Sequence, residues 1–236
     1  MKKIAVIQHV DWEGSGQFLL EAAKRSRVEL CVFEAWQNSF PDPDHFSGVV
    51  MLGGGPNVDD LDQYHFLRLE KDWLQELIRA DKPCLGICLG HQLLAEALGA
   101  TIGQNFCNSV GVVSGLVTSH EKHHPLFKGI KAVMPLFKWH GQSVQTPVPH
   151  HFDILMTSKE CQVEAFSVKG RPHLIGVQFD NHAGSLEDVQ AWCAHDRVWL
   201  DSIGFTAEAI VSAVEVQQVA MRRDFVQLFS MFCTML

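Results

Sequence analysis

Apolar runs alternate with segments of helical periodicity along the first hundred residues. The runs are short and rich in β-branched residues, which is typical of buried strands, whereas the segments between them place apolar residues every three or four positions. Strands are expected at 4–8, 28–33, 48–52 and 83–88. Helices are expected at 16–27, 64–79 and 91–98, the last closed by Gly99. Because strand–helix alternation produces a mostly parallel sheet with helices on both faces, the pattern predicts a three-layer α/β fold.

The pattern changes in the middle third of the chain, where apolar runs follow one another with few helical segments between them. Such runs occur at 110–118, 131–137, 152–157, 163–168 and 173–179. They predict hairpins or an antiparallel extension of the sheet. Helical periodicity returns from about Leu186, with Thr206 as the predicted N-cap of a further helix. The absence of repeats and of a Gly-, Pro- or Ser-rich linker favours one domain over 1–236.

Composition narrows the classes of partner. Hydrophobic residues make up 47% of the 236 residues, charged residues 19%, and the net charge is −8. This balance argues against a nucleic-acid or membrane surface as the main partner. The apolar N-terminus ends at Gln8 without a cleavage site and is predicted to be a strand rather than a signal peptide. Seven cysteines without a Cys-x-x-Cys pair indicate a reducing cytoplasm and no structural metal site.

The segment Gly86-Ile87-Cys88-Leu89-Gly90 lies between a predicted strand and a predicted helix. A G-x-C-x-G sequence in this position is typical of a nucleophile elbow, in which the flanking glycines permit a tight turn that exposes the side chain. The start of the following helix favours thiolate, the reactive form of Cys88. The alternative is a buried core cysteine beside two incidental glycines.

The motifs GICLGHQ (86–92) and VVMLGGGP (49–56) resemble the elbow and oxyanion loop of class I glutamine amidotransferases. QHVDWEG (8–14), KWHGQSV (138–144) and IGVQFD (175–180) are similar to other segments of that family, in the same order. The similarity is closest to stand-alone proteins related to the glutaminase part of GMP synthetase. It implies a flavodoxin-like sheet, an amide-hydrolysing activity that proceeds through a thioester on Cys88, and no cofactor.

The resemblance also implies roles for the neighbours of Cys88. Backbone N–H groups near Gly54 and Gly55, together with that of Leu89, would form the oxyanion hole. Gln92 would help to hold the substrate, glutamine or a γ-glutamyl compound, although it is alternatively an exposed residue of the first helical turn. Family members pass ammonia to a synthetase, so a separate synthetase is an expected partner; a homodimer is the other.

The sequence departs from the family where the base is expected. The family follows Q-F with His-Pro-Glu, whereas this chain has Asp180 at the His position and His182 at the Glu position. A carboxylate beside Cys88 would disfavour thiolate, and an Asp of ordinary pKa would be a poor acid for departing ammonia. The alternative is a reordered triad, in which His182 pairs with the thiol and Asp180 orients it.

Other positions also differ from the family. An acidic residue expected near Val110 is absent, since Asn108 and Ser109 precede it, and the residue after W-H-G is Gln142. His140 is expected to be a structural turn residue. His120, His123 and His124 either bind a metal ion or, as we favour, belong to a solvated loop. The sequence is compatible with three functions: an amide hydrolase, a catalytically inactive binding or regulatory protein, and other thiol chemistry at Cys88.

Overall fold

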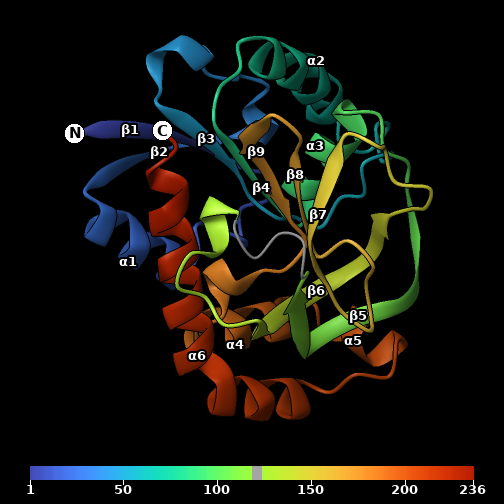
Figure 1. Cartoon of the computed structure of the whole chain (residues 1–236). Helices are drawn as coiled ribbons and strands as arrows, with labels where there is room; N and C mark the ends of the chain where they lie inside the picture. Colours follow the sequence, from blue (N-terminus) through green and yellow to red (C-terminus); the bar gives the residue numbers. More distant parts are fainter. Residues whose placement is uncertain (119–123) are drawn as a thin grey trace.

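A single twisted sheet organises the part of the chain that the structure describes, residues 1–118 and 124–236 of a computed structural model (Figure 1). Within these residues the sheet contains nine strands in the order β2-β1-β3-β4-β9-β8-β7-β5-β6. The strands are β1 (Lys2–Gln8), β2 (Val28–Glu34), β3 (Gly48–Met51), β4 (Cys84–Ile87), β5 (Ile102–Val117), β6 (Val133–Val144), β7 (Phe152–Thr157), β8 (Ala165–Val168) and β9 (Arg171–Val177).

One half of the sheet is parallel, as the sequence predicted. β1 pairs with β2 and β3, β3 pairs with β4, and β4 pairs with β9, all in the parallel sense. The carboxyl ends of these strands therefore meet at one edge, which is where ligands bind in open α/β sheets. The predicted class, an α/β fold with helices on both faces, is confirmed.

The other half, β8-β7-β5-β6, is antiparallel and forms the predicted extension. Two boundaries were wrong. β5 begins at Ile102 rather than at 110, and its pairing with β6 shifts register between Gln104 and Ser109. β6 continues to Val144, so the expected turn around His140 is a paired strand, because Ile102–Gln104 provide partners for its last residues.

Helices cover both faces of the sheet (Figure 1). They are α1 (Gly16–Ser26), α2 (Phe66–Arg79), α3 (Leu89–Ala97), α4 (Leu186–His195), α5 (Arg197–Ser202) and α6 (Ala207–Cys233). The predicted cap of α6 is present, because the Thr206 side chain accepts a hydrogen bond from the Ala209 N–H. α1 packs against α6, and the side chain of Lys2 bonds the carbonyl of Leu236, so the two ends of the described chain lie side by side.

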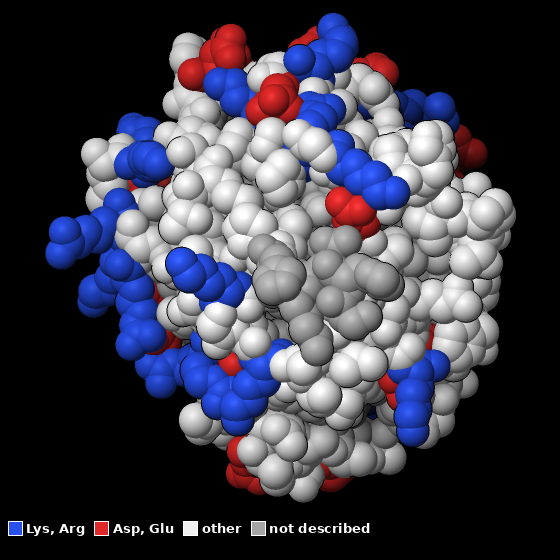
Figure 2. Space-filling view, viewed as in Figure 1, with Lys and Arg blue, Asp and Glu red and all other residues white. Residues whose placement is uncertain are grey.

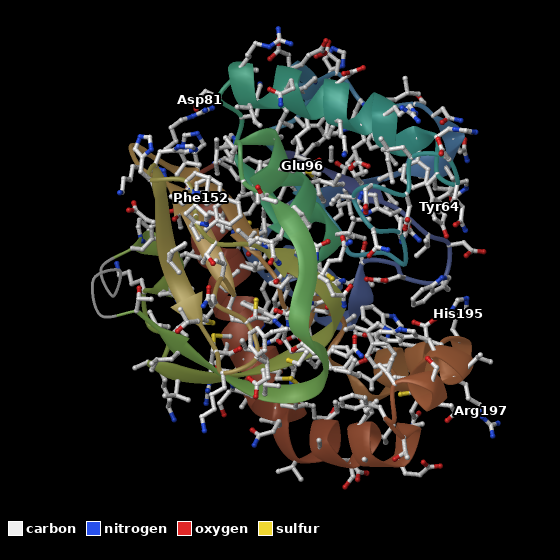
Figure 3. The ribbon with its side chains drawn as sticks, turned by 90° about the vertical axis from the view of Figure 1, so that its right-hand side faces the viewer. Tyr64, Asp81, Glu96, Phe152, His195 and Arg197 are labelled. Atoms are coloured by element: carbon white, nitrogen blue, oxygen red, sulfur yellow. The ribbon has the colours of Figure 1, made fainter. Side chains whose placement is uncertain are left out.

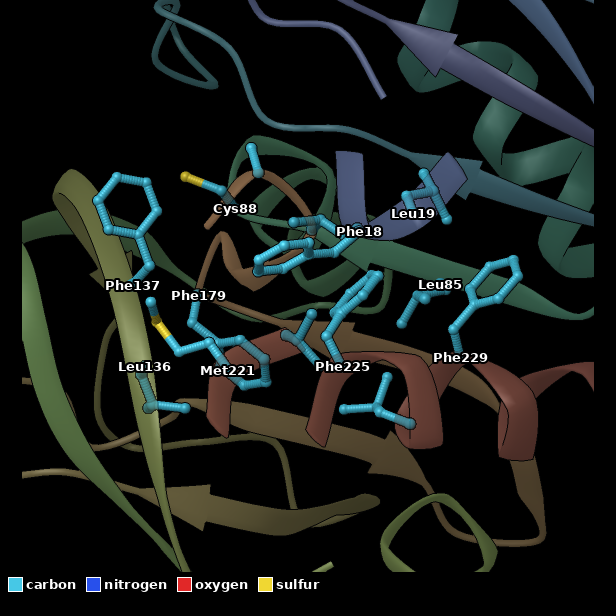
Figure 4. Packing of buried hydrophobic residues seen from close by; sticks show 14 of the residues in the cluster. Phe18, Leu19, Leu85, Cys88, Leu136, Phe137, Phe179, Met221, Phe225 and Phe229 are labelled. Carbon is cyan, nitrogen blue, oxygen red and sulfur yellow. The ribbon is translucent and has the colours of Figure 1, made fainter. Parts of the chain in front are cut away.

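Alternating strand residues supply two separate apolar cores. Ile4 and Val6 pack with α1 and α6, whereas Ala5 and Ile7 pack with α2 and α3. Figure 4 shows Phe179, Phe225 and Phe229 in the first of these cores, with Cys88 near its edge. The period of two along each strand thus explains why both sheet faces are buried.

The face seen in Figure 2 carries charges of both signs, with many of its Lys and Arg side chains gathered toward the left and lower left. No helix within 1–118 and 124–236 combines the length and apolarity needed to cross a membrane. Of the histidine cluster, His120 and His123 lie outside the described residues. His124 is buried, and its Nδ1 accepts a hydrogen bond from the Leu126 N–H, a structural contact.

Candidate active site

Cys88 lies at the sharp turn between β4 and α3. Its backbone has φ 49° and ψ −105°, a backbone conformation that residues other than glycine rarely adopt. The turn is held by two main-chain bonds, from the Cys88 N–H to the Val177 carbonyl and from the Gly90 N–H to the Leu52 carbonyl. This is the strained strand-to-helix geometry of a nucleophile elbow.

The two flanking glycines are required by close packing. A Cβ on Gly86 would lie 2.8 Å from the His91 nitrogen, and one on Gly90 would lie 2.6 Å from the Met51 Cβ. Real Cβ atoms essentially never approach other atoms so closely. The G-x-C-x-G spacing is therefore explained by the approach of α3 to the sheet.

The glycine loop after β3 lies beside the elbow. A Cβ on Gly54 would be 3.4 Å from the Leu89 side chain, so the loop and the first residue of α3 are in contact. No hydrogen bond of the described residues uses the N–H of Gly54, Gly55 or Leu89. Free N–H groups beside a nucleophile are the components of an oxyanion hole.

His9 supports this loop from below. Its Nδ1 bonds the Gly53 carbonyl at 2.8 Å and its Nε2 bonds the Glu70 carboxylate at 2.9 Å, with both side chains fully buried. Burial lowers the pKa of His9, but the Glu70 carboxylate more than offsets this, so the pKa is raised from 6.5. A protonated ring donates both bonds, which fixes the loop carbonyl in place.

A cavity of about 340 Å³ opens above Cys88. Five predicted site residues line it: Gly54, Gly55, Cys88, Leu89 and Gln92. The other walls include Trp12, Glu13, Asn108, Trp139, His140, Gln142, Asp196 and Trp199. Figure 3 labels His195, the last residue of α4 and the neighbour of Asp196 in sequence. A volume of this size accommodates a small molecule such as an amino acid.

Asp180 and His182 lie below the cavity, just after β9, and both are fully buried. The Asp180 N–H donates to the Phe137 carbonyl, and the Asn181 side chain bonds the main chain of β6 at Phe137 and Pro135. These bonds fix the turn that presents Asp180. Neither ring nitrogen of His182 has a hydrogen-bond partner among the described residues, so His182 is not paired with Cys88.

The charges around the thiol oppose its ionisation. Burial raises the pKa of Cys88 well above its ordinary value, and the carboxylates of Asp180 and Glu13 raise it further. Burial raises the pKa of Asp180 to about 8, against the opposing effect of Lys138. Burial also raises the pKa of Glu13, and lowers that of His182 to about 3. The expectation of an ordinary Asp180 pKa was therefore wrong, because desolvation was not visible in the sequence.

A family model described as glutamine amidotransferase class I matches residues 13–182, well over half of the chain. The chain belongs to the class I glutamine amidotransferase family. This confirms the resemblance carried by its motifs.

Several curated relatives of this amidotransferase chain are named as one subunit of glutamine-hydrolyzing GMP synthase. The protein from Methanocaldococcus jannaschii is 34% identical over 138 residues, which is 58% of this chain and 66% of that relative. The one from Halobacterium salinarum is 29% identical over 180 residues, 76% of this chain and 91% of that relative. The match thus spans slightly less than two thirds of the Methanocaldococcus protein.

A solved glutamine amidotransferase from Thermotoga maritima has the same fold. It superposes with a TM-score of 0.87 at 20% sequence identity, covering 98% of each chain. A structure from Thermoplasma acidophilum, described as a GMP synthase subunit, superposes less closely, with a TM-score of 0.62 over 77% of this chain and 85% of that one. At these identities the likeness shows the fold alone.

Gln92 and His140 lie at the cavity of the amidotransferase site, whereas His91 lies in the core. Gln92 is buried rather than exposed, and its amide donates to the Gln142 carbonyl and to Gln178. His140 lines the cavity, and its Nδ1 bonds the Gln142 carbonyl. His91 packs against Phe166, and burial lowers its pKa to about 3. Its ring therefore belongs to the core.

Sequence reasoning missed the buried charges. Lys138 forms a fully buried ion pair with Glu164 and acts electrostatically on both Cys88 and Asp180. Glu13 and Asp196 line the cavity. Lys138 and Glu13 lie within the motifs KWHGQSV and QHVDWEG, but the motifs do not reveal that these charged side chains are buried near Cys88.

Proposed function

We propose that this protein hydrolyses the side-chain amide of glutamine or of a γ-glutamyl compound through a thioester on Cys88, slowly at neutral pH. The single observation that carries the proposal is Cys88 at a strained elbow in the cavity, beside the free N–H groups of Gly54 and Leu89. A substrate carbonyl between them would be attacked by sulfur while its oxygen accepts those N–H bonds.

Asp180 is the group placed to move the proton in this scheme. Because its pKa lies at about 8, Asp180 is largely protonated at neutral pH and can donate to departing ammonia, as a buried carboxylic acid does elsewhere. The same protonation leaves Cys88 without a base. Turnover should therefore be slow at pH 7 and should rise as Asp180 ionises.

The cavity also offers a partner for the substrate's ammonium group. The acidic residue expected near Asn108 is missing, but the Asp196 carboxylate lines the cavity, where it accepts a bond from Trp139 and pairs with His195. We assign Asp196 this countercharge. Asp196→Asn should raise KM with little change in kcat.

The direct test is mass spectrometry of the intact protein after exposure to an electrophilic glutamine analogue. The proposal predicts one covalent adduct per chain on wild type and none on Cys88→Ala. Ammonia release from glutamine, measured from pH 7 to pH 9, then reports turnover. An unlabelled Cys88 at saturating analogue would overturn the proposed thioester chemistry.

A second candidate is a catalytically inactive binding or regulatory protein. It is favoured by the carboxylates of Asp180 and Glu13, which raise the pKa of Cys88. Calorimetry distinguishes the two: glutamine binding that is equal in wild type and Cys88→Ala, without ammonia release at any pH, would support this second function.

Ammonia from the proposed reaction would pass to a synthetase on a separate polypeptide. The support is that curated relatives are named as one subunit of GMP synthase, which denotes part of a larger enzyme. Co-purification with such a synthetase, and a rise in ammonia release in its presence, would test this partnership against a homodimer.

A further inference from the structure

Three buried side chains converge beneath the cavity. Glu13 comes from the loop after β1, and Asp180 and His182 come from the turn after β9. Each offers one ligand-type atom, and these atoms all lie within 4.8 Å of one another. In the described chain this is the group of His, Cys, Asp and Glu side chains whose spacing suits a metal ion.

The buried polar atoms of two of the three side chains are incompletely hydrogen-bonded within the described residues. Both ring nitrogens of His182 are buried and unpaired among the described residues, and the Asp180 carboxylate has there only the Cys88 thiol as a hydrogen-bonding neighbour. Buried polar atoms are nearly always paired, and unpaired ones indicate a place for an ion or a water molecule. Here an unpaired ring nitrogen of His182 lies within 4.8 Å of a carboxylate oxygen of Asp180 and of one of Glu13.

The carboxylates also lack a cation of their own. The buried cation near them, Lys138, is already bound to Glu164 within the part of the chain that is described. Two buried carboxylates beside each other are unfavourable unless a proton or a cation lies between them. A bound cation would satisfy both the charge and the unpaired atoms.

We propose that Glu13, Asp180 and His182 bind a divalent transition-metal ion of the zinc class. Carboxylate and imidazole are ligands that zinc takes at about 2.0–2.2 Å, and three protein ligands leave a coordination position open. Ligand atoms at this distance from a tetrahedrally coordinated ion lie about 3.4 Å from one another. The ligand atoms of the three side chains, which lie within 4.8 Å of one another, would therefore have to approach by up to about 1.5 Å.

The surroundings allow such a site. Gly53 faces it, and a Cβ there would collide with Glu13 Oε1 and lie 3.2 Å from Asp180 Oδ1, so glycine keeps this space open. Glu13 also lines the cavity, which gives an ion a path from solvent. The site departs from the sequence-based expectation of no metal, because Glu13 is far from the other two in sequence.

A cation here would change the thiol chemistry, and this consequence alone rests on the proposed function. A divalent ion would displace the proton that Asp180 holds at neutral pH, so Asp180 would no longer donate to ammonia, and the ion would offset the charges of Asp180 and Glu13, which disfavour the Cys88 thiolate. Metal binding itself does not depend on turnover.

The test is direct titration of the chelator-treated full chain with Zn²⁺ in equilibrium dialysis, followed by Co²⁺ titration in the visible range. One ion per chain is expected. Glu13→Gln and Asp180→Asn, which nearly preserve shape, should each weaken binding at least tenfold, and His182→Ala should do the same. His173→Ala, which removes a surface histidine paired with Asp81, is the matched control and should leave affinity unchanged.

Thermal unfolding with and without Zn²⁺ gives a second readout. The ion should raise the Tm of wild type and of Cys88→Ser, but not of Glu13→Gln. Stoichiometric binding that survives both Glu13→Gln and Asp180→Asn would overturn the site, as would a wild type that binds no Zn²⁺ at millimolar concentration. Loss of binding in Cys88→Ser would also overturn the three-ligand assignment. Failure of ammonia release with intact Zn²⁺ binding would count against the proposed function instead.

Discussion

The elbow and the end of β9 face the same thiol but follow the family to different degrees. At the elbow, main-chain geometry is decisive: Cys88 has a positive φ, Gly86 and Gly90 permit close packing, and the loop N–H groups are free. At the end of β9, side-chain chemistry is decisive, and there Asp180 and His182 replace the family's His and Glu.

A scaffold for acyl transfer can therefore persist while the groups that transfer protons are changed. Backbone N–H groups and glycine contacts are tied to the packing of the sheet, so altering them damages the fold. The side chains after β9 are held by Asn181 and the Phe137 carbonyl, and these bonds do not depend on the chemistry at 180 or 182. The base can thus change without loss of structure.

The largest expected effect comes from restoring the family's order at the end of β9. Asp180→His combined with His182→Glu should raise ammonia release from glutamine by about 10²-fold, the scale of a positioned general base. Recovery should stay partial because Asn108 and Ser109 are unchanged. Ammonia release at pH 7 measures the effect.

Cys88→Ser on both backgrounds is the control for this comparison and should abolish turnover. Robust wild-type turnover that the double change abolishes would show that His182 is a working base, contrary to the proposal.

A substitution at the elbow should instead lower the stability of the fold. Gly86→Ala should destabilise the protein by about 1–3 kcal/mol, because its Cβ would overlap the first turn of α3. Gly141→Ala is the matched control: its nearest neighbours would lie at 3.5 Å, an ordinary contact. Urea unfolding measures both, and equal stability of the two variants would refute the packing argument.

A smaller effect is expected from the support beneath the oxyanion loop. The folded pKa of His9 is raised above 6.5, so its pair with Glu70 stabilises the fold below that pH and the contribution is lost as pH rises through the folded pKa. Glu70→Gln should abolish this pH dependence and lower the free energy of unfolding by on the order of 1 kcal/mol at pH 6. Unfolding free energies from pH 6 to pH 9 provide the test, and identical pH slopes would contradict it.

The sequence predicted the sheet class, the elbow and the glycine loop because each has a local signature. Hydrophobic period, G-x-C-x-G and GGGP are all readable from neighbours in the chain. The register of β5 and β6 was not readable, since the pairing of Ile102 with Val144 joins residues far apart in the sequence. The assignment of one domain to 1–236 stays a prediction.

The side chains around Cys88 show more clearly which properties the sequence alone does not predict. The exchange at Asp180 and His182 was visible from the motif, but the raised pKa of Asp180 depends on burial and on Lys138. Glu13 reaches the same place from the other end of the chain. Charges gathered from separate elements become visible only when the fold brings them together.

A carboxylate, rather than an imidazole, faces the Cys88 thiol, and the consequence can be measured on the thiol itself. The experiment is the pH dependence of Cys88 alkylation, followed by peptide mass spectrometry in chelator-treated wild type and Asp180→Asn. We expect the wild-type thiol to titrate above the ordinary cysteine value of 9.0 and Asp180→Asn to shift the titration to lower pH. A wild-type thiol that is already ionised at neutral pH, or one that Asp180→Asn leaves unchanged, would contradict this assignment.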